Sequence, residues 1–476
     1  MMKSFMDQDF LLDTGVAQQL YHDIAADLPI IDYHSHLPPD EIANRKSWRN
    51  MTELWLGGDH YKWRLMRSAG IDESLITGDA DDEAKFNAFC SALPQAIGNP
   101  IYHWSHLELR RIFGIDTLIN AKNAPQLWSD INAKLAQMDS WSMLKQANVE
   151  IACTTDDPAD DLLDHQHIAN SSLNTRVLPA FRPDKAMRIN DAGFIDYLAT
   201  LSQCSGVEIY SFKQLITALA QRIEFFHLHG ARISDHAVDL ALPHQIISDT
   251  ELEVIFQQRL AGQLLSSAAQ SQYLFAILAQ LAPHYAAQQW TMCLHIGAQR
   301  NNNQRQLIRL GADTGYDAIS GMDVSLGLAH LLDTLDVQQC LPKTMLFCLN
   351  PNLNEVLSTL MGCYQDGSIA GKVQFGPAWW FNDHKEGNLQ QFITLANHGV
   401  FGAFVGMVTD SRSFASYPRH DYFRRLLCRQ VGAWVESGEY PHDDEALSQI
   451  IRGVCYDNAK KIFLIIKNSQ SPAIDH

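Results

Sequence analysis

The stretch Pro29-Ile30-Ile31-Asp32-Tyr33-His34-Ser35-His36 is a short apolar run that ends in two histidines one residue apart. A short apolar run bounded by polar residues is typical of a buried strand, so Pro29–Tyr33 is predicted to be one. In extended backbone, residues two apart point to the same side, and both imidazoles could then face one ion. Imidazole is a common zinc ligand. Alone, His-x-His is a weak signal, because two ordinary loop histidines give the same pattern.

Similar runs recur along the chain, each ending on a polar residue and followed by helical periodicity. After Pro29–Tyr33 they are Val149–Thr154, Arg176–Phe181, Ala231–Ser234, Trp290–Leu294, Thr344–Leu349, Lys372–Phe375 and Phe401–Val408. Short apolar runs that alternate with helical stretches predict βα units and a parallel sheet. Eight such units predict an α/β fold of the (β/α)8 TIM-barrel type, whose active site lies at the carboxyl ends of the strands.

Two long intervals interrupt this alternation. Residues 38–148 exceed the usual loop length and contain helical patterns such as Asp81–Ala96, so we expect a mostly helical cap over the barrel mouth. A second helical insertion is predicted at residues 240–288. Because no repeat or flexible linker marks a boundary, residues 1–476 are predicted to form a single elaborated barrel domain.

The composition restricts the class of protein. The chain has 36 basic and 54 acidic residues, a net charge of −18, which argues against a surface for nucleic acid or anionic membrane. No apolar run is long enough to cross a bilayer, and we find no secretion signal. Nine cysteines without a Cys-x-x-Cys pair fit reduced thiols. We therefore expect a cytoplasmic enzyme, in which an anionic substrate would need its own arginines.

The predicted strand ends are rich in histidine, carboxylate and arginine. They include His34, His36, Thr155, Asp156, Arg182, Asp235, His236, His295, Asn350, Trp379, Trp380, Asp410 and Arg412. The His-x-His pair, His295 and Asp410 could converge across a barrel mouth. Their order resembles the amidohydrolase superfamily, whose hydrolytic members often add a bridging lysine at the fourth strand and a second metal. Here that strand ends in Ser234-Asp235-His236, which favours one metal and weakens a hydrolase interpretation.

Five longer motifs narrow the resemblance. They are DYHSHL at residues 32–37, WLGGDHYKWR at 55–64, HIGAQRNNN at 295–303, AWWFND at 378–383 and GMVTDSR at 406–412. Together they resemble the uronate (glucuronate) isomerase family, and the similarity covers essentially the whole chain. The family interconverts D-glucuronate with D-fructuronate and D-galacturonate with D-tagaturonate in hexuronate breakdown.

The resemblance implies one bound divalent ion and a set of site residues. Zinc is the expected ion, with manganese, iron and cobalt as alternatives. The implied ligands are His34, His36 and Asp410, with His295 in or beside the coordination shell. The other implied active-site residues are His60, Tyr61, Arg182, Asp235, Arg300 and Arg412, and Trp380 is expected to contact the substrate. The expected partners are a small hexuronate and further copies of the chain, with neither nucleic acid nor membrane.

The residue types suit aldose–ketose isomerisation, which moves a proton from C2 to C1 through an enediol. The reaction needs a base near the carbon and groups that hold charge on the oxygens. A metal could hold the C6 carboxylate, and arginines could bind the remaining oxygens. The C2-proton carrier stays open among Asp410, Tyr61 and His60. We favour Asp410 for hydroxyl protons and Tyr61 for the carbon-bound proton, its pKa lowered by Arg412 or the metal.

Several residues also have ordinary structural interpretations. Arg300 could be a surface residue in an ion pair, and at least one of Trp379 and Trp380 is expected to pack in the core. Asp235 could cap the following helix, and His236 is interpreted as a satisfied structural histidine. A turn is expected at Asp156–Asp157, before Pro158. His227 and His229 form a second His-x-His pair, but they follow a helical pattern, so we assign them no metal.

Two other functions remain as alternatives. One is a mononuclear hydrolase or deaminase of the same superfamily, and the other is a sugar-acid-binding protein without activity. Neither the native metal, nor the preference between glucuronate and galacturonate, nor the oligomeric state follows from the sequence.

Overall fold

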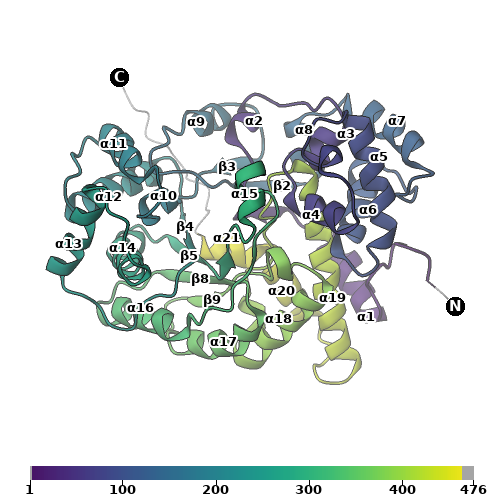
Figure 1. Ribbon diagram of the computed structural model, residues 1–476. Coiled ribbons are helices and arrows are strands. Elements are labelled where there is room, and N and C mark those ends of the chain that lie inside the picture. Colours follow the sequence, from purple (N-terminus) through teal and green to yellow (C-terminus); the bar gives the residue numbers. More distant parts are fainter. Residues whose placement is uncertain (1–2, 464–476) are drawn as a thin grey trace.

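Parallel strands occupy the centre of the molecule and helices surround them (Figure 1). The computed structural model describes residues 3–463. One sheet has the order β1-β2-β3 and another has the order β4-β5-β8-β9, and all these pairs are parallel. Phe181 bridges the two sheets, since it pairs with Asp156 on one side and with Ser234 on the other. The strands are β1 (Ile30–Asp32), β2 (Val149–Cys153), β3 (Arg176–Leu178), β4 (Ile233–Val238), β5 (Thr291–Ile296), β8 (Lys343–Cys348) and β9 (Val373–Phe375). The prediction of an α/β fold with a parallel sheet is confirmed.

Strands β4 and β5 extend beyond the apolar runs that predicted them. Asp235 and His236 lie inside β4, and His295 lies inside β5. The sequence pattern ended both strands too early because it treated a polar residue as a strand end. In a strand, successive side chains point to opposite faces, so a polar side chain can belong to a fully paired strand.

The predicted eighth strand, Phe401–Val408, is wrong as a regular strand. Its first residues form the 3-10 helix η6 (Phe401–Ala403), and the rest is buried backbone that pairs with no strand of residues 3–463. Gly406 is the physical reason, because its φ of 70° interrupts extended backbone. A Cβ at this glycine would lie 2.1 Å from the Val454 carbonyl oxygen. Two backbone hydrogen bonds nevertheless hold the following residues beside the exit of β1, from Asp410 N to His34 O (3.1 Å) and from His36 N to Ser411 O (3.0 Å).

Helices occupy the first long interval, at the purple and blue end of the chain in Figure 1. Residues 38–148 contain α2 (Pro39–Ala43), α3 (Met51–Leu56), α4 (His60–Ser68), α5 (Asp82–Ala92), α6 (Pro100–Phe113), α7 (Ala124–Leu135) and α8 (Ser140–Gln146), and no strand. Residues 240–288 contain α13 (Asp249–Leu260) and α14 (Ser267–Ala287). The division into one barrel domain with two insertions stays a prediction.

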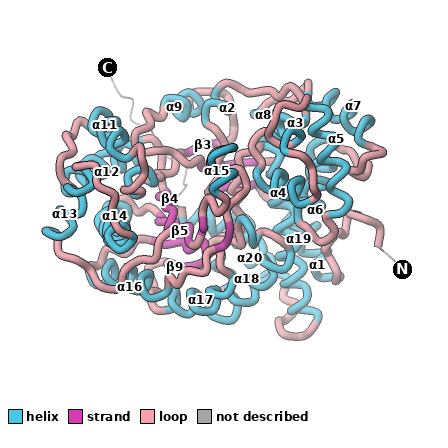
Figure 2. Tube along the Cα trace, viewed as in Figure 1, coloured by secondary structure: helices cyan, strands magenta, loops and turns pink. Residues whose placement is uncertain are grey.

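Most of the remaining helices lie around the strands, whereas α15 (Gln304–Leu310) lies over the middle of the molecule in this view (Figure 2). The others are α1 (Gly15–Gln19), α9 (Leu163–Ala169), α10 (Asp184–Met187), α11 (Phe194–Ser205), α12 (Phe212–Leu228), α16 (Ser325–Val337), α17 (Asn354–Gly362), α18 (Lys385–His398), α19 (Pro418–Glu436), α20 (Asp444–Arg452) and α21 (Asn458–Ile462). A small antiparallel pair is formed by β6 (Ala298–Gln299) and β7 (Ala318–Ile319), and α15 lies between these two strands along the chain. Within residues 3–463, none of the helices has the length and apolar character needed to span a membrane.

Candidate active site

A cavity of about 1220 Å³ opens where the strands end and meets the helices of residues 38–148. Its wall contains all but one of the site residues expected from the sequence, namely His34, His36, His60, Tyr61, Arg182, His295, Arg300, Trp380, Asp410 and Arg412. The exception is Asp235, which is fully buried beneath the wall. Its predicted contact with substrate is therefore not supported by its position.

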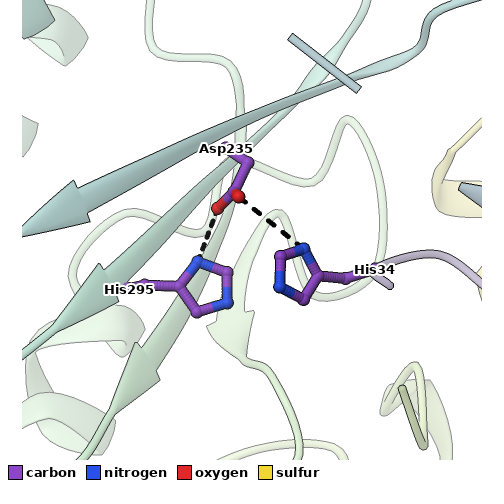
Figure 3. Close-up of side chains that lie close together, drawn as sticks. All are labelled: His34, Asp235 and His295. Carbon is purple, nitrogen blue, oxygen red and sulfur yellow. Dashed lines mark ion pairs between the residues drawn. The ribbon is translucent and has the colours of Figure 1, made fainter. Parts of the chain in front are cut away.

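His34 lies between two carboxylates. Its Nε2 is 3.0 Å from Asp410 Oδ1, and His36 Nε2 is 3.2 Å from the same oxygen. Its Nδ1 is 3.7 Å from Asp235 Oδ2, while His295 Nδ1 is 2.5 Å from Asp235 Oδ1 (Figure 3). Two groups of potential ligand atoms therefore share His34. One group adds His36 and Asp410, the other adds Asp235 and His295, and within each group the atoms lie within 4.8 Å of one another.

The first group has the donor set of a zinc site that keeps a position open for substrate. Such sites use about three protein ligands, commonly histidine and carboxylate, and leave the remaining position free. His34, His36 and Asp410 fit this description because all three line the cavity. Thr155 Oγ1 lies 2.8 Å from His36 Nδ1, so a hydrogen bond orients the ring and leaves Nε2 for a metal.

His295 differs from the other expected ligands. It belongs to the group that contains Asp235 and not to the group of His36 and Asp410, although it lines the same cavity. Both of its ring nitrogens are buried and have no aligned hydrogen-bond partner among residues 3–463. The Phe347 ring stacks on the His295 ring with centroids 4.3 Å apart. The Trp379 ring packs against it edge to face, with centroids 4.7 Å apart. The four expected ligands are therefore divided between two overlapping groups.

The two histidines of the first group differ in charge. Burial opposes the charged form of His34, but the Asp235 and Asp410 carboxylates raise its pKa above the usual value. Burial by itself would raise the pKa of Asp410, but hydrogen bonds from His34 and His36 and their charges hold it well below its usual value. Burial lowers the pKa of His36 to about 4, so this imidazole is neutral near pH 7 and its nitrogen can bind a metal.

Arg182 neutralises the second group. Burial opposes the charge of Asp235, but the Arg182 guanidinium, with Nη1 2.9 Å from Asp235 Oδ2, holds the pKa of this carboxyl well below its usual value. Arg182 Nε also donates to Asp184 at 2.9 Å. Asp235 is thus a strand residue in an ion pair, and its interpretation as a helix cap is wrong.

Two other structural interpretations are also corrected. His236 is fully buried, but neither ring nitrogen has a hydrogen-bond partner among the described residues, so it is not satisfied. Asp156 pairs with Phe181 in the sheet, and its carboxylate accepts from Thr154 Oγ1 at 2.7 Å. The expected turn instead begins at Asp157, whose carbonyl oxygen accepts from Asp160 N at 2.9 Å. In both cases tertiary contacts decided what local sequence preferences could not.

Helix α4 presents His60 and Tyr61 at its first turn. The Asp59 side chain caps this helix by accepting from the backbone amides of Tyr61 (2.9 Å) and Lys62 (3.1 Å). The rings of His60 and Tyr61 stack with their centroids 4.7 Å apart. The rings of His60 and Trp380 meet edge to face, with centroids 5.6 Å apart.

The pKa of Tyr61 moves in the direction opposite to the one expected. Burial raises it well above its usual value, and the Asp410 carboxylate raises it further. Arg419 is the cation that opposes this rise, whereas Arg412 is 45% exposed and pairs with Asp313 at 3.8 Å. Arg412 is therefore not among the main groups that act on the pKa of Tyr61, and a lowering by bound metal stays a prediction. Burial lowers the pKa of His60, which favours its neutral form.

Arg300 both pairs with a carboxylate and lines the cavity. Its Nη1 lies 3.2 Å from Asp317 Oδ2, and its guanidinium covers the Trp380 ring at 4.8 Å. Trp379 and Trp380 are both buried, which agrees with the expected core packing. Trp380 has a φ of 50° and Asp410 a φ of 46°. Such values are costly for residues with large side chains and are concentrated at functional sites.

The second His-x-His pair has other partners. Trp290 Nε1 donates to His227 Nδ1 at 3.0 Å, and His229 Nδ1 lies 2.8 Å from the Phe225 carbonyl oxygen. Neither histidine belongs to a group of potential metal ligands within residues 3–463.

The residues that support Asp410 are not among those predicted from the sequence. Asp32 accepts from Thr409 N at 2.8 Å and from Thr409 Oγ1 at 2.5 Å, and Arg419 contacts the Thr409 carbonyl oxygen. A carboxylate inside the apolar run at residues 29–33 was a signal for Asp32. No local pattern distinguishes Arg419 from the neighbouring arginines of α19.

Comparison with known proteins gives consistent results. A family model described as glucuronate isomerase matches residues 2–463. A uronate isomerase from Caldicellulosiruptor saccharolyticus is 52% identical over 97% of this chain and 100% of its own length. A crystal structure of uronate isomerase from Thermotoga maritima has a TM-score of 0.91 and 31% identity, covering 97% of this chain and 100% of that one. A crystal structure of glucuronate isomerase from Caulobacter crescentus has a TM-score of 0.88 and 27% identity, covering 99% and 98%.

Proposed function

Because this chain belongs to the glucuronate isomerase family and is an isomerase, we propose that it interconverts D-glucuronate with D-fructuronate, and D-galacturonate with D-tagaturonate. The observation that carries the proposal is the convergence of His34, His36 and Asp410 with His60 and Tyr61 at one cavity. A site for ligand binding alone would not require this concentration of groups that can move protons.

Arginines in the cavity wall support an anionic sugar. Arg182, Arg300 and Arg412 line the cavity, although the whole protein carries a net charge of −18. Guanidinium groups bind carboxylate and hydroxyl oxygens with directed hydrogen bonds. These three arginines would offset the repulsion that a hexuronate meets from the rest of the molecule.

One divalent ion is proposed at His34, His36 and Asp410, with His295 beside it. Zinc is the expected ion, and manganese, iron and cobalt fit the same ligands. When bound, the ion would supply chelation of the C6 carboxylate and a neighbouring hydroxyl. Arg182, through Asp235, would keep His34 and His295 in place.

The protein groups would move protons between C2, C1 and the two oxygens. Asp410 is proposed to exchange hydroxyl protons, since it is a carboxylate at the cavity wall. Tyr61 or His60 would move the proton between C2 and C1. The low pKa of His60 favours this imidazole as the acceptor, and the high pKa of Tyr61 favours its phenol as a hydrogen-bond donor to the enediol oxygens.

Isotope exchange tests the reaction. The zinc-loaded protein is incubated with D-glucuronate in D₂O, and the recovered sugar is examined by NMR. We expect deuterium at C2, because the proton removed there would exchange with solvent before the reverse reaction. A hydrolase or deaminase would leave C2 unlabelled, and absence of label with both glucuronate and galacturonate would overturn the proposal.

Two variants separate the proton carriers. Tyr61→Phe keeps the ring but removes the hydroxyl, and His60→Gln removes the imidazole. The variant that abolishes C2 exchange while still binding metal identifies the carrier. Chelation should abolish exchange in the wild type, and return of zinc should restore it.

We also propose that residues 404–411 complete a closed (β/α)8 barrel without forming a regular strand. The hydrogen bonds from Asp410 N to His34 O and from His36 N to Ser411 O support this, since they join the last segment to the first strand. Closure predicts slow amide exchange at both residues, measurable by NMR or mass spectrometry.

A further inference from the structure

Arg419 is a buried arginine near the start of α19, only 5% exposed, at the edge of the cavity. Its contacts come from three separate parts of the chain. Nη2 is 2.9 Å from Asp383 Oδ2, and the same nitrogen donates to the Thr409 carbonyl oxygen. The guanidinium also covers the Trp104 ring of α6 at 4.7 Å. Such an arrangement fixes the guanidinium independently of any ligand.

The Thr409 carbonyl belongs to the peptide group that precedes Asp410. The N–H of the same peptide group donates to the His34 carbonyl oxygen at 3.1 Å. Both polar ends of this peptide group are therefore held, one by Arg419 and the other by the chain at the end of β1. Asp32 additionally binds the N–H and the hydroxyl of Thr409.

Holding this peptide group matters because of the backbone at Asp410. Its φ is 46°, a conformation that residues with side chains adopt rarely and at a cost. A peptide group held at both ends prevents relaxation to negative φ. In the observed conformation, Asp410 Oδ1 lies within 3.2 Å of nitrogens of both His34 and His36.

We infer that Arg419 is a positioning residue that keeps Asp410 in its left-handed conformation and so forms the metal site before metal binds. The inference rests on the proposed metal site. Arg419 itself acts through the Thr409–Asp410 peptide group and contacts no ligand atom. Asp383 and Trp104 hold the guanidinium in place.

The test compares two buried arginines of the same helix. Arg419→Met keeps much of the side-chain volume and removes the donors. Arg425→Met is the matched control, since Arg425 is also 5% exposed but donates to the carbonyls of Gln8 (2.9 Å) and Phe10 (3.0 Å). Two quantities are measured: amide exchange of residues 404–412 in the metal-free proteins, and zinc affinity by chelator competition.

We expect faster exchange at the Asp410 amide in Arg419→Met, together with a loss of zinc affinity of about 10- to 100-fold, as is typical of residues that orient ligands. Arg425→Met should match the wild type in both. Arg419→Lys, which keeps one donor, should recover part of the affinity. The inference would be overturned if Arg419→Met had the amide exchange and zinc affinity of the wild type. It would also be overturned if the two methionine variants lost zinc affinity equally.

If Arg419→Met does not fold, Asp383→Asn tests the same inference. This variant leaves the guanidinium present but removes its charged partner, so exchange at Asp410 should rise and zinc affinity should fall. Unchanged values would again overturn the inference. A wild-type protein that bound no zinc would instead contradict the proposed metal site, and the exchange measurement would still test how the peptide group is held.

Discussion

His34 has neighbours from two regions that are built in different ways. Asp235 and His295 belong to the regular pair β4 and β5, where Asp235 pairs with Cys293 and His295 with Ala237. Asp410 lies outside any regular strand, has a φ of 46°, and its backbone amide donates to the carbonyl oxygen of the distant His34.

The two regions of backbone hold carboxylates that differ in their surroundings. A backbone ladder places side chains at fixed spacing, and Asp235 is buried there with Arg182 as its counter-ion. The irregular segment instead turns Asp410 toward the cavity, where two histidines share one of its oxygens. The strand-held carboxylate therefore lies beneath the cavity, while the carboxylate on strained backbone is the one that lines it.

The comparison predicts the largest effect on activity at Asp410. Asp410→Asn should lower kcat by about 100- to 10,000-fold, because it removes a proposed ligand and proton carrier. Bound zinc, measured by elemental analysis, should also fall. Circular dichroism should show a folded protein, since the Asp235 carboxylate remains beside His34 in this variant. Nearly normal turnover in this variant would contradict the assignment.

The largest effect on stability is predicted at Asp235. Asp235→Asn leaves the Arg182 guanidinium buried with one carboxylate partner fewer, which should lower the free energy of unfolding by about 3 kcal/mol. Urea denaturation measures the change, with Asp410→Asn as the matched comparison. If Asp410→Asn proved the less stable of the two, the division between a supporting and a reactive carboxylate would be reversed.

Thr409→Val tests the side-chain support of the irregular segment. It removes the hydroxyl that donates to Asp32, and should cost about 2 kcal/mol of stability because a hydrogen bond to a buried carboxylate is lost. Thr344→Val in β8 is the control, because the Thr344 hydroxyl donates to the Pro342 carbonyl oxygen at 2.9 Å and not to a carboxylate. Equal changes in the urea midpoint of both variants would show that Asp32 gives no special support.

The last effect is a gradual one that depends on pH and concerns Asp156, which pairs with Phe181 beyond the end of β2. Burial raises the pKa of Asp156 to about 7. The folded state therefore favours the protonated carboxyl, and the stability from this residue is present at low pH and lost as pH rises toward 7. The slope should be at most about 1.4 kcal/mol per pH unit.

Asp156→Asn should remove this component. Urea midpoints of the variant and the wild type are compared between pH 5 and pH 7, and the wild type should lose more stability over that interval. Parallel pH profiles would show that Asp156 is ionised in the folded protein throughout.

Much of the fold and site followed from local pattern. Apolar runs identified seven of the eight expected strands, because burial on both faces leaves a continuous apolar signature. The run at residues 401–408 has the same signature but contains Gly406, whose left-handed backbone breaks the strand. Periodicity reports burial, and burial alone does not distinguish a paired strand from buried irregular chain.

The sequence by itself determined which chemical groups are present. Histidine, carboxylate and arginine at the ends of apolar runs identified the site, and the long motifs identified the family. Tertiary structure alone decided how these groups pair, because the partners are far apart along the chain. Asp32 and Thr409, 377 residues apart, are one example. It divided the expected ligands into two groups and placed Asp235 beneath the cavity. It also made Arg419 the cation that opposes the rise in the pKa of Tyr61.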